Sequence, residues 1–197
     1  PSIDATIPKE EEPQPEPQTG FDDLGSVPWA VEYIEKLAEK NVLNGVSETS
    51  FAPEQNITRE EFVKLMAGVF GLAPEAGSLP FTDVREDAWY YGYLCGAVRH
   101  GIISGTSETT FGVGEAVTRQ DMAVIACRAA AAAGKQLPGG TAEFTDKERI
   151  ADYALESVGQ MNGAGIIQGM GDGRFAPDEY ATRAQAAKIA CLLLEME

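Results

Sequence analysis

The amino-acid sequence predicts a mainly all-α fold built from three helix–loop–helix repeats. One five-residue segment recurs three times, as Ile-Thr-Arg-Glu-Glu at 57–61, Val-Thr-Arg-Gln-Asp at 117–121 and Ala-Thr-Arg-Ala-Gln at 181–185. Each copy precedes apolar residues at the i, i+3, i+4, i+7 spacing of an amphipathic helix. Because no helix pair could bury its apolar face alone, we expect the repeats to pack together as one pseudo-threefold body with little strand.

The recurring segment has the features of a helix start. Its threonine can act as the N-cap, and the residue three positions later can close a capping box, although aspartate is short for this role. The threonines are Thr58, Thr118 and Thr182, and their partners are Glu61, Asp121 and Gln185.

Helix formation does not explain the arginine that follows each threonine. A cation in the first turn lies against the positive end of the helix dipole, which costs roughly a few tenths of a kcal/mol. A single such arginine would be interpreted as solvated or paired with a carboxylate, whereas three matched copies favour a function. A guanidinium beside the free N–H groups of a helix N-terminus would bind a carboxylate or phosphate. We therefore expect Arg59, Arg119 and Arg183 to bind an anionic ligand and to contribute little to stability.

Other landmarks recur in the same order in every repeat. A Phe-x-Asp motif begins at Phe21, Phe81 and Phe144, and an aromatic residue near the next helix start is Trp29, Trp89 or Tyr153. The predicted repeats are 21–76, 77–140 and 141–197, which form one compact pseudo-trimeric domain. Residues 1–20 are rich in proline and glutamate, and we expect a disordered acidic linker there.

The aspartates and tryptophans of these landmarks have two interpretations each. Asp23 and Asp83 precede helices, where aspartate is a common cap or turn residue. Trp29 and Trp89 could be core anchors or platforms for the apolar face of a sugar. Taken singly, the structural role is the favoured one for all four, and ligand binding is the alternative.

The charge and residue composition of the chain restrict the classes of function that it can have. The formal net charge is −16, from 31 acidic and 15 basic residues, which argues against a nucleic-acid partner. No apolar run is long enough to span a membrane. A single histidine, His100, offers no common metal cluster or catalytic triad, so we predict no enzyme activity, cofactor or metal. Paired carboxylates leave catalysis open, but threefold repetition favours multivalent binding. The first residues suggest a piece cut from a larger protein.

Taken in order, the landmarks resemble those of the S-layer homology domain family. Units of that family run as Phe-x-Asp, an aromatic-Ala helix start, a Gly-Ile or Gly-Val turn, Asp-Gly-x-Phe-x-Pro and Ile-Thr-Arg-Ala-Glu. The third repeat carries Gly-Ile-Ile at 165–167 and Asp-Gly-Arg-Phe-Ala-Pro at 172–177. The resemblance covers 21–197 and implies a three-pronged spindle around a central three-helix bundle.

The resemblance also implies a function. Such domains anchor bacterial surface proteins to the cell wall by binding secondary cell-wall polysaccharide, often through pyruvylated N-acetylmannosamine. Ligand sites lie in grooves between units, where the motif arginine meets the pyruvate carboxylate. That role would fall to Arg59, Arg119 and Arg183, with the aspartates and tryptophans named above as further groove residues. The expected location is the bacterial cell surface, with neighbouring surface-layer proteins as further partners.

The sequence departs from the family pattern in ways that predict unequal grooves. No copy has the full Thr-Arg-Ala-Glu, the second has Phe-Gly-Val-Gly at 111–114 where the others have Phe-Ala-Pro, and the third has Tyr153 in place of tryptophan. We expect the groove without tryptophan to bind most weakly. The main alternative function is a protein–protein or self-assembly module, and a glycan-processing enzyme is a weaker one.

Overall fold

A computed structural model describes residues 20–196. Within that range the chain forms six α-helices and two short 3-10 helices, and no strand or sheet. In chain order they are η1 (Leu24–Ser26), α1 (Val31–Glu39), α2 (Arg59–Phe70), α3 (Tyr91–Arg99), α4 (Arg119–Ala132), η2 (Lys147–Arg149), α5 (Asp152–Gly163) and α6 (Arg183–Leu194). The predicted all-α class is confirmed. The predicted linker, except Gly20, lies outside the described residues.

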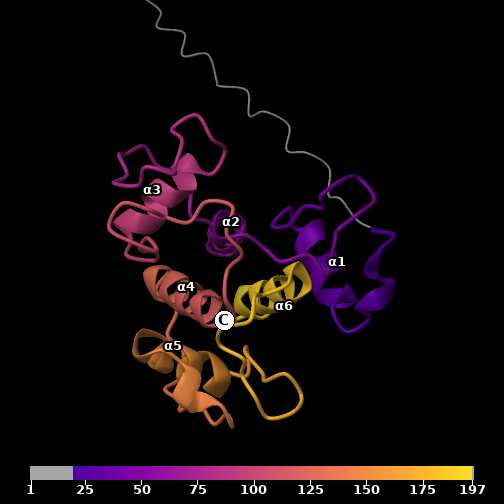
Figure 1. The fold of residues 1–197 in the computed structure, drawn as a ribbon. Helices are drawn as coiled ribbons and strands as arrows, with labels where there is room; N and C mark the ends of the chain where they lie inside the picture. The colour runs from indigo at the N-terminus through magenta and orange to yellow at the C-terminus, as the bar shows by residue number, and fades with distance from the viewer. Residues whose placement is uncertain (1–19, 197) are drawn as a thin grey trace, which may run out of the picture.

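The three helices that begin at the repeated arginines meet at the centre of the molecule. Helices α2, α4 and α6 each contact the other two, and α1, α3 and α5 lie outside them (Figure 1). The outer helices do not pack mainly on the central helix of their own repeat. Instead α3 packs on α2, α5 on α4, and α1 on α6. Each packed helix pair therefore joins two sequence repeats, and the pair α6–α1 joins the two ends of the domain.

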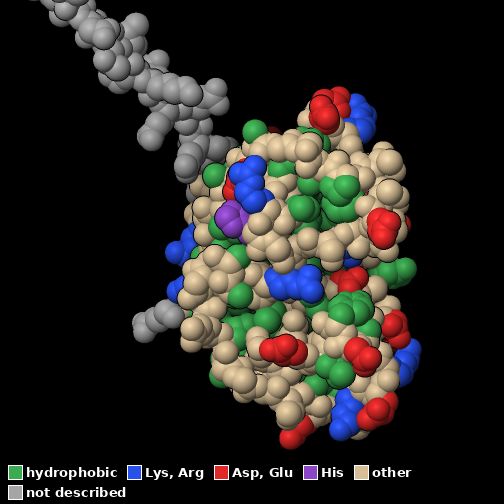
Figure 2. Space-filling model, turned by 90° about the vertical axis from the view of Figure 1, so that its left-hand side faces the viewer, with side chains coloured by type: hydrophobic (Ala, Val, Ile, Leu, Met, Phe, Trp, Pro, Cys, Tyr) green, Lys and Arg blue, Asp and Glu red, His purple; other side chains and the backbone are tan. Residues whose placement is uncertain are grey.

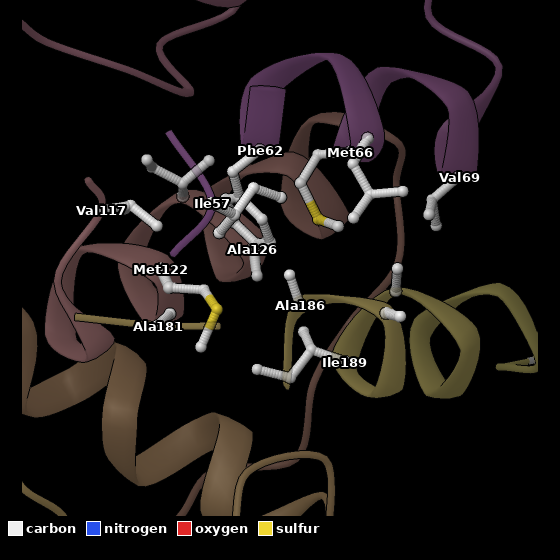
Figure 3. Close-up of a cluster of buried hydrophobic side chains, with 14 of the residues drawn as sticks. Ile57, Phe62, Met66, Val69, Val117, Met122, Ala126, Ala181, Ala186 and Ile189 are labelled. Atoms are coloured by element: carbon white, nitrogen blue, oxygen red, sulfur yellow. The ribbon is translucent and has the colours of Figure 1, made fainter. Parts of the chain in front are cut away.

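A ring of backbone hydrogen bonds connects the three repeats just before the central helices. The N–H of Ile57 donates to the carbonyl oxygen of Ala181 at 3.0 Å, that of Ala181 to Val117 at 2.9 Å, and that of Val117 to Ile57 at 3.0 Å. These residues are matched by position in the three repeats and are buried. Figure 3 shows them beside the core side chains of the central helices. The ring gives the contacts a pseudo-threefold pattern, whereas the spindle outline stays a prediction.

The core on the central helices is graded in size. At the first apolar position the side chains are Phe62, Met122 and Ala186, all buried (Figure 3). Large and small side chains at matched positions can interdigitate, which keeps the packing dense.

The predicted helix caps are present. Thr58 and Thr182 each accept a hydrogen bond from the backbone N–H three residues later, and Glu61 and Gln185 return a bond to the backbone of the threonine. Thr118 accepts from the N–H of Asp121, but no return bond forms. The shorter aspartate explains this difference, as the sequence predicted.

No helix among residues 20–196 is long and apolar enough to cross a membrane. Acidic and basic side chains are interspersed on the face shown in Figure 2, with apolar ones between them. That face carries no continuous basic patch of the kind that binds a nucleic-acid backbone.

Candidate functional site

The three repeated arginines are buried and tie neighbouring repeats together. Arg59, Arg119 and Arg183 are only 5–8% exposed as whole residues. In each, Nε donates to the carbonyl oxygen of a phenylalanine in the next repeat, at 2.8–3.0 Å. Nη2 donates at 3.0–3.3 Å to a second carbonyl of that repeat, in a turn that we call the Gly-turn because a glycine follows the acceptor; the acceptors are Ser104, Gln168 and Asn44. The guanidinium also lies over the phenylalanine ring, 4.8–5.1 Å from its centroid.

This geometry corrects the expectation that the arginines contribute little to the fold. Burial costs a guanidinium its hydration, and it lowers the pKa of Arg119 and Arg183. The two carbonyl acceptors and the aromatic ring offset that cost. Because the third repeat bonds back to the first through Arg183 and Phe51, the three arginines close the ring of repeats. Contacts that hold the fold together therefore account for most of the interactions of each guanidinium.

The first-turn N–H groups of the central helices do not form the predicted anion site. In α4 the N–H of Arg119 donates to the carbonyl of Glu179, and that of Gln120 to Pro177. In α6 the N–H of Arg183 donates to Gln55, and that of Ala184 to Pro53. Loop carbonyls from the neighbouring repeat occupy the donors that a ligand would need. For these groups the expectation of free helix amides was wrong, and Nη1 is the arginine nitrogen whose partners are side chains, which a ligand could displace.

The aspartates of the Phe-x-Asp motifs hold the loop of their own repeat. Asp23 accepts from the N–H of Phe51 and Ala52 at 2.9 and 2.8 Å, and from the hydroxyl of Ser50 at 2.7 Å. Asp83 and Asp146 accept from the matching loops. Burial by itself raises the pKa of these carboxyls, but the loop hydrogen bonds outweigh it and lower the net pKa. Ligand binding by Asp23 and Asp83 stays a prediction.

The aromatic residue at the start of each outer helix is exposed. Trp29, Trp89 and Tyr153 are 48, 54 and 56% exposed. These residues are therefore not core anchors, the interpretation that the sequence favoured for the tryptophans. A large apolar ring that stays exposed to solvent gives up hydrophobic stabilisation. Because an exposed ring occurs at the matched position of all three repeats, we infer that the three rings have the same function.

Three matched hollows, which we call grooves and name after their aromatic residue, lie between the repeats. Each combines a motif arginine from one repeat, a Gly-turn and central helix from the next, and an aromatic residue from the third. Their cavity volumes are 280 Å³ for the Trp29 groove, 190 Å³ for the Trp89 groove and 440 Å³ for the Tyr153 groove. The lining includes Arg119, Gln185 and Lys188 in the Trp29 groove, Arg183, Glu61 and Lys64 in the Trp89 groove, and Arg59, Asp121 and Arg128 in the Tyr153 groove. Small-molecule sites start at roughly 300 Å³; the Tyr153 groove exceeds that size, and the other two are smaller and suit part of a ligand, such as one sugar residue of a polymer.

Comparison with known proteins identifies these repeats. The S-layer homology domain matches residues 20–63, 80–123 and 143–187, one match in each repeat. The chain belongs to the S-layer homology domain family.

Relatives of these S-layer homology repeats include surface-layer proteins and enzymes. The chain is 32% identical over 170 residues to the surface-layer 125 kDa protein of Lysinibacillus sphaericus, covering 85% of this chain and 14% of that protein. It is 31% identical over 176 residues to an endoglucanase of Bacillus sp. (strain KSM-635), covering 88% and 18%. It is 34% identical over 169 residues to exoglucanase XynX of Acetivibrio thermocellus, covering 85% and 16%. The chain thus spans less than a fifth of these relatives.

Family membership settles the broad role of the described region. S-layer homology domains are non-catalytic modules that anchor proteins at the bacterial cell wall, and the enzymes among the relatives match only through this segment. The described region is therefore a cell-wall anchoring module at the cell surface.

Sequence reasoning missed the second cation of each S-layer homology groove. Lys64 and Lys188 lie six residues after their cap threonines, and the second repeat has Val124 at that position but Arg128 one turn further. Lys64 lies 5.3 Å from the ring centroid of Trp89, and Lys188 Nζ donates to Gln168 Oε1 at 3.1 Å. The matched spacing of the two lysines was the signal that could have revealed them.

Proposed function

We propose that the region anchors its parent protein by binding acidic, pyruvylated secondary cell-wall polysaccharide in the three grooves. The observation that carries this proposal is the threefold pairing of an exposed aromatic ring with a preorganised cationic edge. The ring offers a flat apolar surface to one face of a sugar. The arginine Nη1 and the neighbouring lysine or second arginine offer donors to a carboxylate.

The guanidinium is suited to this task because it is already ordered. Its Nε and Nη2 are fixed on backbone carbonyls, so little side-chain entropy remains to be lost when Nη1 meets a ligand. A pyruvyl ketal places a carboxylate on the rim of a sugar ring. One residue of the polymer could then contact the arginine and the aromatic ring together.

The test compares aromatic substitutions, because replacing the buried arginines would also damage the fold. Trp29→Ala and Trp89→Ala remove exposed rings, so the melting temperature should stay close to that of the wild type. In a pull-down on pyruvylated wall polymer, the double variant should bind at least tenfold more weakly, as expected for aromatic anchors. Tyr180→Ala is the matched control, because Tyr180 is 57% exposed and lines none of the three grooves.

Two results would contradict the proposal. One is unchanged binding of the double tryptophan variant, and the other is equal binding of the wild type to polymer stripped of pyruvate. Binding to a purified surface-layer protein without affinity for the saccharide would favour the protein–protein alternative. A hydrolysis assay on wall polymer separates the enzymatic alternative, for which we expect no turnover.

A further inference from the structure

The three grooves differ in the residue that faces the arginine Nη1. This residue is the third of its central helix, the position that also closes the capping box in α2 and α6. It is Glu61 in the Trp89 groove, Asp121 in the Tyr153 groove and Gln185 in the Trp29 groove. Two grooves thus place a carboxylate beside their cation, and one places a neutral amide there.

In the Trp29 groove no carboxylate lines the cavity beside the cations, although Glu179 and Asp146 act electrostatically on Arg119 from outside the lining. Arg119 Nη1 donates to Gln185 Oε1 at 3.3 Å, and Lys188 donates to the amide oxygen of Gln168. No aspartate or glutamate is among the lining residues of this groove. Amide oxygens satisfy the donors without cancelling their charge. Two formal positive charges therefore face the cavity.

In the Trp89 groove the arginine has an anionic neighbour and the lysine lies over the groove's own tryptophan, whereas Lys188 lies 6.0 Å from the ring centroid of Tyr33, which does not line the Trp29 groove. Arg183 Nη1 lies 3.7 Å from Glu61 Oε1. Lys64 lies over the ring of Trp89, the surface that a sugar would use. A ligand carboxylate entering here would meet the repulsion of Glu61 and compete for both cations.

The Tyr153 groove is bridged by its own side chains. Asp121 accepts from Arg59 Nη1 at 3.1 Å through one oxygen and from the Tyr153 hydroxyl at 2.7 Å through the other. Burial and this carboxylate raise the pKa of Tyr153 to about 12, so the hydroxyl stays a donor. The bridge joins the arginine to the aromatic ring and occupies the position between them.

We propose that the Trp29 groove is the principal site for the acidic saccharide, and that the residue at the third helical position sets the affinity of each groove. This ranking rests on the proposed function. It assigns Gln185 as the residue that opens the Trp29 groove, and Glu61 and Asp121 as those that weaken the other two.

The chain supplies its own matched substitutions. Glu61 in α2 and Gln185 in α6 close equivalent capping boxes with their cap threonines. Glu61→Gln and Gln185→Glu therefore each introduce a side chain that already closes this box elsewhere in the domain. The double variant Glu61→Gln/Gln185→Glu also keeps the net charge. Any change in binding then reports the location of the carboxylate rather than total charge or stability.

The chain also supplies its own reporters, because its two tryptophans lie in different grooves. Trp89→Phe leaves Trp29 to report on its groove, and Trp29→Phe leaves Trp89. Each background is titrated with pyruvylated N-acetylmannosamine while tryptophan fluorescence is recorded. Plain N-acetylmannosamine is the control for the contribution of the carboxylate.

We expect the Trp29 reporter to give an affinity about tenfold higher than the Trp89 reporter, equivalent to about 1.4 kcal/mol. The charge exchange should invert this order. Equal affinities in the two backgrounds, or an order that survives the exchange, would overturn the groove ranking while leaving the proposed function intact. If the fluorescence of neither tryptophan changed during the titration, the proposed function itself would be contradicted.

Discussion

Replacement of Arg119 by alanine tests whether the motif arginines hold the fold together. The residue is 5% exposed, and its side chain donates from Nε to Phe175 O at 2.8 Å and from Nη2 to Gln168 O at 3.3 Å. Both acceptors belong to the third repeat, whereas Arg119 belongs to the second. The substitution therefore removes a connection between repeats and leaves two carbonyl oxygens without these donors.

The size of the effect follows from those contacts. Leaving a buried acceptor unsatisfied costs about 1–3 kcal/mol, and loss of the ring contact adds about 0.5–1 kcal/mol. Relaxation and entry of water reduce the sum, so we expect a loss of about 2–4 kcal/mol. For a domain of this size each kcal/mol lowers the melting temperature by about 2–4 °C. The expected fall is roughly 5–15 °C.

Differential scanning calorimetry at neutral pH measures this fall. Arg119→Lys is the informative companion, because it keeps the charge but cannot reproduce the planar fork, and it should lose most of the same stability. Arg85→Ala is the matched control, since that side chain is 76% exposed and forms its ion pair with Asp87, which is also exposed. A melting temperature for Arg119→Ala within a degree of the wild type would refute the structural role.

Two further predictions concern the loops and pH. Ala52 adopts the left-handed conformation (φ 56°), which Gly112 adopts at the matched position (φ 89°). Ala52→Gly should therefore leave the free energy of unfolding unchanged or raise it by up to about 1 kcal/mol, and Gly112→Ala should lower it by about 1 kcal/mol. Urea unfolding measures both changes. Asp23, Asp83 and Asp146 have folded-state pKa values below their usual 3.8; the stability they supply is fully present above about pH 4 and is lost as pH falls through the lowered values. Thermal scans from pH 7 to pH 2 should show this loss, and Asp83→Asn should flatten it. An unchanged acid response in that variant would contradict the loop-holding role.

The sequence allowed the repeat register, the helix starts and the helical class to be predicted, because these depend on local patterns. Thr58 and Glu61 specify a capping box by spacing alone, and the short side chain of Asp121 predicted the missing return bond. The apolar positions of the central helices likewise predicted buried faces.

The relations between repeats could not be predicted in the same way. A repeating sequence is unchanged when its units are shifted around a ring, so it does not reveal whether α1 packs on α2 or on α6. For the same reason the arginines looked unnecessary for folding. Their acceptors are backbone carbonyls of Phe51, Phe111 and Phe175. Every residue has such a carbonyl, so the sequence does not indicate which ones accept these hydrogen bonds.

The candidate site was partly predictable for a related reason. The arginines and tryptophans recur at matched positions and were found, whereas the lysines recur in only two of the three repeats and were overlooked. The charge difference between grooves depends on which repeats meet. Gln185 faces Arg119, from another repeat, and no local pattern connects the two.

A crystal structure of the domain with pyruvylated N-acetylmannosamine would locate the acidic saccharide. We expect the sugar ring against Trp29, with a pyruvyl carboxylate oxygen within hydrogen-bonding distance of Arg119 Nη1 and Lys188 Nζ. We also expect higher occupancy in this groove than in the other two. A saccharide bound outside the grooves, or bound in a groove with its carboxylate turned to solvent, would show that the grooves do not recognise the acidic group.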